Sequence, residues 1–430
     1  MPLRLDTRAS DFQQQFQAFL GAKREASQDV EQTVRAIVND VVARGDQALV
    51  DYSQKFDRID LNKVGICISA DEIAAAQKQC DPEALGALSI AKSRIETYHR
   101  RQLPKDDSWT DALGVELGHR WTAIEAVGLY VPGGTAAYPS SVLMNAVPAK
   151  VAGVPRVAMV VPSPDGKLMP LVLAAAALAG VDEIYRVGGA QAVAALAYGT
   201  ETISPVAKIV GPGNAYVAAA KRLVFGKVGI DMIAGPSEVL ILADRDSNPE
   251  WVAADLLAQA EHDVAAQSIL ITNDAAFADA VEAALTRQLK TLPRGEVAAA
   301  SWRDFGAIIL VRDFDEAIPL TDAIAPEHLE IETEDADRLV GKIRNAGAIF
   351  IGRHTPEAIG DYVAGSNHVL PTARSARFSS GLGVLDFMKR TSLLRLSPDA
   401  LRALGPSAIA LGKAEGLEAH SRSVSIRLNL

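Results

Sequence analysis

The sequence predicts an α/β protein with two parallel sheets and with helical pieces at both ends of the chain. Short apolar runs alternate with alanine-rich, helix-like stretches from about residue 122 onward, and strands separated by helices form βαβ units with parallel pairing. The alternation occurs as two successive series, which predicts two α/β domains. A length of 430 residues, 49% of them apolar, is enough to bury two such cores.

The segments before the first series are predicted to be helical. Phe12, Phe16 and Phe19 lie at helical spacing within residues 8–51, and residues 85–103 again have a helical pattern that ends in the charged loop RRQLPKDD.

The two series themselves follow from apolar runs bounded by glycine or proline. The first series has predicted strands at 157–161, 183–187 and 207–210 and predicted helices at 169–179, 190–198 and 214–225. The second has predicted strands at 239–243, 268–272, 307–311, 329–332 and 348–351 and predicted helices at 249–261, 275–290, 314–324 and 334–345.

The end of the chain has a different pattern. After Phe387 we expect mostly helix, with Leu394, Leu401, Leu404 and Leu411 on one side. This piece is too small to fold alone, so it should pack on another domain or another subunit.

Composition excludes several classes of protein. Acidic residues outnumber basic ones 53 to 43, for a formal charge of −10, which argues against a nucleic-acid surface. The sequence has no apolar run of about 18 residues, so no membrane span is expected, and its start has no signal-peptide pattern. Two cysteines, Cys67 and Cys80, cannot build a disulfide framework, which favours a cytoplasmic protein.

Three predicted strand-to-helix turns contain glycine: VPGGTAAYPSS at 131–141, VGGAQAVAAL at 187–196 and VGPGNAYVAAAK at 210–221. Glycine lets the backbone approach a phosphate, and the following helix start offers free N–H groups. None is a full GxGxxG, so each alone could be an ordinary tight turn. Three together at the carboxyl edge of a parallel sheet favour a nucleotide site.

Metal-ligand candidates lie among seven histidines and their neighbours. The stretch WVAADLLAQAEHD puts Gln259 and His262 on one face of a predicted helix. Asp361 lies in a helix that we expect to be capped by Thr355. A cluster near the C-terminus contains Glu415, Glu418 and His420. No HExxH, CxxC or HxH spacing links these groups, so spacing alone leaves solvated surface residues as an alternative.

The segment APEHLEIE offers an acid–base pair. Pro326 ends the helix before it and favours an extended Ala325. Glu327 and His328 then lie at the start of a strand, where neighbouring side chains point to opposite faces. They could share a site only if the chain is irregular here. An exposed, charged strand start is the alternative interpretation.

Taken together, these segments resemble the histidinol dehydrogenase family. The matching blocks occur in family order from about residue 128 to residue 424; they are GLYVPGGTAAYPSSVLMNAVPAKVAGV, RVGGAQAVAALAYGT, KIVGPGNAYVAAAKR, DMIAGPSEVLILAD, DLLAQAEHD, APEHLEI, GDYVAGSNHVLPT, FSSGLGVLDF and EGLEAHSRSV. Several are long and unusual, which makes a chance match implausible.

The resemblance implies a fold of two incomplete Rossmann-like domains plus terminal helical pieces in an intertwined homodimer. On this basis we expect an N-terminal helical arm at 1–25, a large domain formed by 26–129 and 238–380, a second domain at 130–237, and a helical tail at 381–430 that packs on the other subunit.

The resemblance also implies roles for individual residues and a zinc ion in each subunit. The zinc ligands would be Gln259, His262, Asp361 and His420, the last from the neighbouring subunit. The residues that contact NAD would be Tyr130, Gln191 and Asn214, and the catalytic pair would be Glu327 and His328. The substrate L-histidinol would meet Ser237, Gln259, His262, His328, Asp361, Glu415 and His420. His119, His354 and His368 are left as structural residues.

The implied reaction is a four-electron oxidation of an amino alcohol to an amino acid, which needs two NAD and one water. His328 would take the hydroxyl proton and Glu327 would activate water for attack on the aldehyde. Two alternatives remain at this stage: a zinc hydrolase in which Glu327 activates water, and a non-catalytic nucleotide-binding protein. A rival dehydrogenase mechanism would need a reactive thiol at Cys67 or Cys80.

Overall fold

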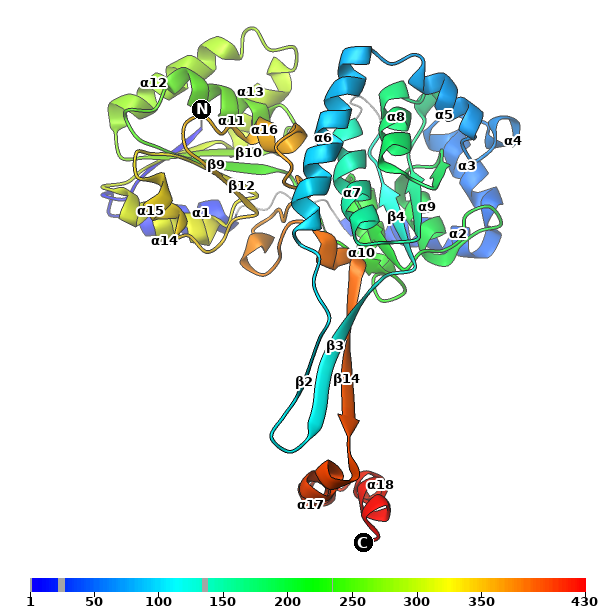
Figure 1. The fold of residues 1–430 in the computed structure, drawn as a ribbon. Coiled ribbons are helices and arrows are strands. Elements are labelled where there is room, and N and C mark those ends of the chain that lie inside the picture. The colour runs from blue at the N-terminus through cyan, green and yellow to red at the C-terminus, as the bar shows by residue number, and fades with distance from the viewer. Residues whose placement is uncertain (1, 22–27, 134–137, 234) are drawn as a thin grey trace.

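In a computed structural model the chain forms two α/β lobes and a long arm that projects from them (Figure 1). The structure describes residues 2–21, 28–133, 138–233 and 235–430. Each lobe contains one parallel sheet with helices on both faces. The predicted α/β class with two parallel sheets is therefore confirmed.

The larger sheet has six strands in the order β1-β11-β10-β9-β12-β13, all parallel. The strands are β1 (Leu3–Asp6), β9 (Glu238–Ala243), β10 (Gln267–Thr272), β11 (Ala307–Leu310), β12 (His328–Glu332) and β13 (Ala348–Ile351). Helices α1 (Phe12–Gly21), α14 (Phe314–Ile324) and α15 (Ala336–Val340) contribute to the core on one face. Helices α11 (Pro249–Ala260), α12 (Ala275–Gln288) and α13 (Gly295–Phe305) form the core on the other.

The smaller sheet has five parallel strands in the order β6-β5-β4-β7-β8. They are β4 (Ala126–Tyr130), β5 (Arg156–Val160), β6 (Glu183–Tyr185), β7 (Lys208–Val210) and β8 (Gly229–Ile230). One face is covered by α5 (Ala70–Gln77), α6 (Pro82–Arg100), α7 (Pro139–Val151) and α8 (Pro170–Ala179). The other is covered by α2 (Gln28–Arg44), α3 (Asp46–Phe56), α9 (Gly189–Tyr198) and α10 (Ala215–Val224), with the short α4 (Leu61–Val64) beside α3.

Continuous burial explains why strands such as β9, β10 and β12 were predicted, whereas β1, β4 and β8 were not among the predicted strands. Every residue of β4, β9, β10 and β12 is buried, as expected for parallel strands covered by helices on both faces. The runs are therefore rich in apolar residues rather than alternating.

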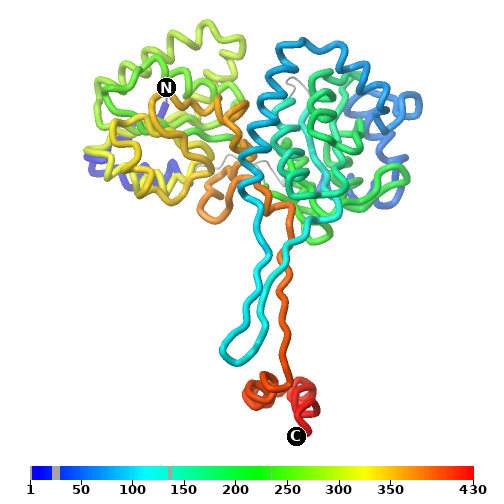
Figure 2. The backbone as a smooth tube through the Cα atoms, in the orientation of Figure 1, coloured from blue at the N-terminus to red at the C-terminus, as the bar shows by residue number. Residues whose placement is uncertain are grey.

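The arm is a three-stranded antiparallel sheet with two helices at its tip (Figure 2). Its strands are β2 (Asp107–Thr110), β3 (Val115–Ala123) and β14 (Met388–Leu396), and its tip consists of α17 (Pro398–Ala414) and α18 (Glu418–Leu428). Strand β14 pairs with β3 along its whole length, from Met388 opposite Ala123 to Leu396 opposite Val115.

Three expectations about secondary structure and packing need correction. Residues 388–396 form a strand and not part of a helical tail, because pairing with β3 outweighs the helical spacing of the leucines. The expected arm at 1–25 contributes β1, an edge strand of the larger sheet, as well as α1. Helices α2 to α6, within 28–100, pack on the smaller sheet, whereas the expected division joined 26–129 to 238–380.

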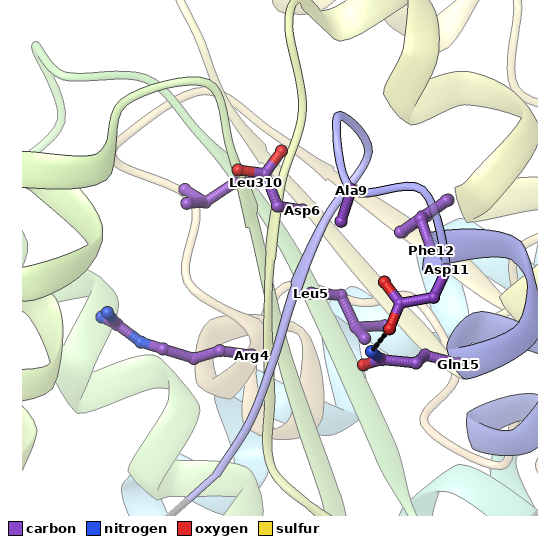
Figure 3. A pocket seen from close by; sticks show the side chains of 8 residues that line it. All are labelled: Arg4, Leu5, Asp6, Ala9, Asp11, Phe12, Gln15 and Leu310. Carbon is purple, nitrogen blue, oxygen red and sulfur yellow. Dashed lines mark hydrogen bonds between the residues drawn. The ribbon is translucent and has the colours of Figure 1, made fainter.

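The N-terminal segment also lines a small pocket of about 180 Å³, in which Gln15 donates a hydrogen bond to Asp11 (Figure 3). None of the candidate site residues lines it. No helix in the described ranges is long and apolar enough to cross a membrane.

Candidate active site

The candidate residues from the two lobes gather where the amino edge of the larger sheet meets the carboxyl edge of the smaller one. His328 is the first residue of β12, and Tyr130 is the last residue of β4. His368 connects the two lobes: its Nε2 lies 3.2 Å from Oγ of Ser141, at the start of α7, and its Nδ1 lies 3.0 Å from the Asp361 carbonyl oxygen. The site is therefore built between the lobes.

Glu327 and His328 share one buried site, as only an irregular chain would allow. Ala325 has left-handed backbone angles (φ 48°, ψ 62°) instead of the expected extended geometry, and β12 starts only at His328. The Glu327 Oε2 atom lies 3.9 Å from His328 Nδ1. Both side chains are held by one residue: the Glu238 N–H donates to Glu327 at 3.1 Å, and the Glu238 carbonyl lies 3.1 Å from His328 Nδ1.

These contacts fix the proton positions on the His328 ring. A carbonyl can only accept, so Nδ1 carries the proton and donates to Glu238. Nε2 is buried without a hydrogen-bond partner among the described residues and lies 3.6 Å from Asp361 Oδ1. The free Nε2 is therefore the atom that can accept a proton.

Burial and neighbouring carboxyl groups shift the pKa values of Glu327 and His328. Burial raises the pKa of Glu327 to about 7. Burial lowers the pKa of His328, but the carboxylates of Glu357, Glu327 and Asp361 outweigh it and raise that pKa well above its ordinary value. Glu327 can thus exchange protons near neutral pH, and the carboxylates around His328 favour its imidazolium form.

Three of the four predicted metal ligands lie in or just after two packed helices. Gln259 lies in the last turn of α11, and His262 follows two residues after the helix ends at Ala260, not inside the helix as predicted. Asp361 lies in α16 (Glu357–Tyr362), which packs against α11. The N-cap of α16 is Pro356, and the predicted cap Thr355 instead donates its hydroxyl hydrogen to Ile351.

His262 and Asp361 affect each other's pKa through their charges. The His262 side chain is exposed. Desolvation nevertheless lowers its pKa, and this effect outweighs the negative charge of Asp361, which raises the pKa. Burial raises the pKa of Asp361, but His328 outweighs it and holds that pKa below its ordinary value. The Gln259 side chain is fully buried, and neither Oε1 nor Nε2 has a partner among the described residues. An orphaned amide beside an imidazole and a carboxylate is an arrangement that a cation would satisfy.

Glu415 and His420 lie elsewhere in the same chain. They belong to the helical tip of the arm, far from both lobes (Figure 2). Ser237, in contrast, directly precedes Glu238 and so lies beside the acid–base pair. The other candidates lie in the two lobes: the acid–base pair, Ser237 and the other metal-ligand candidates in the larger lobe, and the residues of the glycine turns in the smaller one.

The three glycine turns meet at the carboxyl edge of the smaller sheet. The strand order places a topological switch point between β4 and β7, and open α/β sheets bind ligands in the crevice at such a point. Tyr130 ends β4, and Asn214 caps α10 just after β7 by accepting from the Tyr216 and Val217 N–H groups. Residues 134–137 of the first turn lie outside the described residues.

Tyr130 and the second turn are joined by a hydrogen bond. The Gly189 N–H donates to the Tyr130 hydroxyl at 3.0 Å, and burial raises the pKa of Tyr130 to about 12. Gln191 is buried in the first turn of α9, close enough that a Cβ on Gly189 would lie 2.7 Å from its Oε1. Tyr130 and Gln191 therefore line the same turn.

Glu357 is a site residue that the sequence interpretation missed. Its Oε1 lies 3.8 Å from His328 Nδ1, and together with His328 and Asp361 it forms a group whose ligand atoms lie within 4.8 Å of one another. Burial raises its pKa to about 8. Its position one helical turn before Asp361 was the available signal, because residues four apart share a helix face.

Comparisons with known proteins agree on one family. The sequence model described as "Histidinol dehydrogenase" matches residues 21–428. Among curated relatives, the histidinol dehydrogenase of Rhizobium meliloti (strain 1021) is 72% identical over 100% of this chain and 99% of its own, and that of Bradyrhizobium diazoefficiens is 73% identical over the full length of both. The crystal structure of histidinol dehydrogenase from Elizabethkingia anophelis has a TM-score of 0.95 at 35% identity and covers 100% of this chain and 98% of that one.

Proposed function

Because the chain belongs to the histidinol dehydrogenase family of oxidoreductases, we propose that it oxidises L-histidinol to L-histidine through bound L-histidinal, the last steps of histidine biosynthesis. Two NAD accept the two hydrides, and one water supplies the second carboxylate oxygen. The observation that supports the proposal is the buried acid–base pair: Glu327 Oε2 lies 3.9 Å from His328 Nδ1, and Asp361 Oδ1 lies 3.6 Å from His328 Nε2. The glycine turns at the switch point of the smaller sheet add a place for a dinucleotide.

A zinc ion would be held by Gln259, His262 and Asp361, with His420 from a second copy of the chain. The orphaned amide of Gln259 supports this assignment, and an oxygen and nitrogen ligand set suits zinc. When bound, the ion would supply an anchor for the imidazole and amine nitrogens of the substrate. Ser237 and Glu415, the latter from the second copy, would complete the substrate contacts.

NAD would lie at the switch point of the smaller sheet, against Tyr130, Gln191 and Asn214. The Tyr130 hydroxyl and the Asn214 cap flank the crevice there, and the start of α10 offers the partial positive charge of a helix N-terminus to the pyrophosphate.

In the first oxidation, His328 takes the hydroxyl proton at Nε2 while the carbon-bound hydrogen leaves as hydride to NAD. The Glu238 carbonyl holds the other ring nitrogen in the donor tautomer. The carboxylates of Glu357 and Glu327, 3.8 and 3.9 Å from Nδ1, stabilise the imidazolium that results.

In the second oxidation, Glu327 takes a proton from water as the oxygen bonds to the aldehyde carbon. A carboxyl group whose pKa burial raises to about 7 is a stronger base than an exposed one. After His328 has released its first proton to solvent, the hydrate loses its hydroxyl proton to His328 and its hydride to a second NAD. A cysteine route has no support, because Cys67 forms a β-bridge with Tyr185 and the Cys80 thiol donates to the Ala76 carbonyl in α5. Desolvation also raises the pKa of Cys67.

The arm supports a homodimer with shared sites. Its β14 and its tip helices expose large apolar side chains, among them Leu394 at 66%, Leu411 at 64% and Ile426 at 67%. An apolar surface of this kind is typical of an interface. A second copy would cover it and would bring Glu415 and His420 to the first copy's lobes. We also propose a cytoplasmic location, because both cysteines are free thiols and NAD is the oxidant.

One assay tests the proposal. Purified protein with L-histidinol and NAD should form two NADH for each histidine produced. Metal-dependent hydrolysis without NADH formation would favour the hydrolase in which Glu327 activates water and would refute the dehydrogenase. Light scattering should give a dimer mass; a monomer with full activity would refute the shared sites.

A further inference from the structure

A buried ion pair lies beneath the third glycine turn and takes no part in the proposed chemistry. It joins Lys221, in α10, to Asp231, just after β8. The side chains are only 2% and 1% exposed. Burying two charges costs free energy, and their mutual attraction often does not offset that cost. A contribution to stability alone therefore explains the pair poorly.

Both members of the pair hold the backbone of the same residue, Gly211. The Gly211 N–H donates to Asp231 Oδ2 at 2.8 Å, and Lys221 Nζ donates to the Gly211 carbonyl at 3.0 Å. Gly211 has a φ of +109°, and a Cβ there would lie 2.2 Å from the Tyr130 carbonyl oxygen. The ion pair therefore holds Gly211 by two hydrogen bonds, and the Tyr130 carbonyl leaves no room for a side chain at this position.

The two chain segments that leave this pair both lead to candidate site residues. Asn214 follows Gly211 by three residues and starts α10, the helix that carries Lys221. Asp231 Oδ1 also accepts from the Met232 N–H at 2.6 Å, at the start of the segment that reaches Ser237. The pair thus joins the turn on the cofactor side to the chain that crosses to the other lobe.

We propose that Lys221 and Asp231 are positioning residues for the dinucleotide. Their hydrogen bonds to Gly211 fix the conformation of the turn that carries Asn214 against Tyr130. This inference rests on the proposed function, which places NAD at this edge of the sheet. The pair makes no hydrogen bond to any candidate zinc ligand. Its loss should therefore weaken NAD binding selectively.

The test uses the full-length protein and three variants: Lys221→Met, Asp231→Asn and the double variant. The double variant removes both charges and so leaves no unpaired buried ion, which makes it the variant best able to fold. Glu183→Gln is the matched control, because it breaks the partly buried Arg156–Glu183 pair at the amino edge of the same sheet. The measurements are the Kd of NADH by fluorescence, KM for NAD and for histidinol, and bound zinc.

The Kd of NADH and KM for NAD should rise about tenfold in the variants, equivalent to about 1.4 kcal/mol, with KM for histidinol and zinc content within about twofold of wild type. The control should change none of the four. A folded double variant whose NADH affinity is unchanged would overturn the positioning role, and so would equal losses of NAD, histidinol and zinc binding. Wild-type protein that neither binds nor forms NADH would instead overturn the proposed function.

Discussion

Replacing Glu332 by Gln should remove a pH dependence from the stability of this protein. Glu332, at the end of β12, is 4% exposed. Asp255 and Glu330 each place a carboxylate oxygen within 4.8 Å of one of its own. Burial first, and then the charge of Asp255, raises the pKa of Glu332 to about 8. The folded protein therefore keeps this group neutral at a pH where the unfolded chain ionises it.

The sign and size of the effect follow from linkage. The unfolded group titrates near 4.5 and the folded one near 8, so the folded state binds the extra proton between these values. The stability that this proton contributes is fully present below 4.5 and is lost as the pH rises to 8. Each pH unit changes the free energy of unfolding by about 1.4 kcal/mol. Because the folded group is already half ionised at pH 8, wild type should lose about 2 kcal/mol through Glu332 between pH 6 and pH 8.

Urea unfolding followed by circular dichroism at pH 6, 7 and 8, with a chelator to remove metal linkage, measures this loss. Gln has the shape of a neutral carboxylic acid, so the variant should match wild type within about 1 kcal/mol at pH 6 and exceed it at pH 8. Glu316→Gln is the control. Arg312 lowers the pKa of Glu316 to about 2, so that group titrates below the whole window. Parallel pH profiles for wild type and Glu332→Gln would refute the reasoning.

Four further variants test the proposed site and mechanism. His262→Ala should abolish zinc binding and turnover together, measured by metal analysis and NADH formation; an active, metal-free variant would contradict the ligand role. Glu327→Gln should slow oxidation of added histidinal by about 10²-fold or more and affect the alcohol step less, so normal histidinal turnover would disprove the assignment. Gly211→Ala should cost about 1–3 kcal/mol of stability and raise KM for NAD, because the new Cβ meets the neighbouring backbone; an unchanged melting temperature would speak against the tight turn. Changing Cys67 and Cys80 to Ala should leave kcat within about twofold of wild type, and its loss would revive the thiol mechanism.

The elements that were predictable from the sequence are those whose local pattern and buried environment agree. The strands of both lobes are short apolar runs, and the glycine turns follow them at one edge, so the parallel-strand rule placed the three turns together. Boundaries differ by one or two residues for most of these elements. Helix 334–345 is the exception, since only Ala336–Val340 is helical.

Features that depend on distant partners could not be predicted. Residues 388–396 are mostly exposed and contain helix-spaced leucines, and only pairing with β3 makes them a strand. Nothing in the sequence assigns α2 to α6 to the smaller sheet. Glu357 has the local pattern of an exposed helix residue, and its burial against His328 depends on the packing of α16 on β12. The interlobe location of Glu327 likewise depends on the backbone at Ala325.

The projecting arm has a consequence for genetics. If each reaction centre takes its acid–base pair from one chain and residue 420 from the other, then Glu327→Gln chains and His420→Ala chains are each inactive alone. A mixed dimer of the two contains one centre with both defects and one centre with none. Co-expression of two dead alleles should therefore restore roughly a quarter of normal activity, as random assortment in a twofold-symmetric assembly requires.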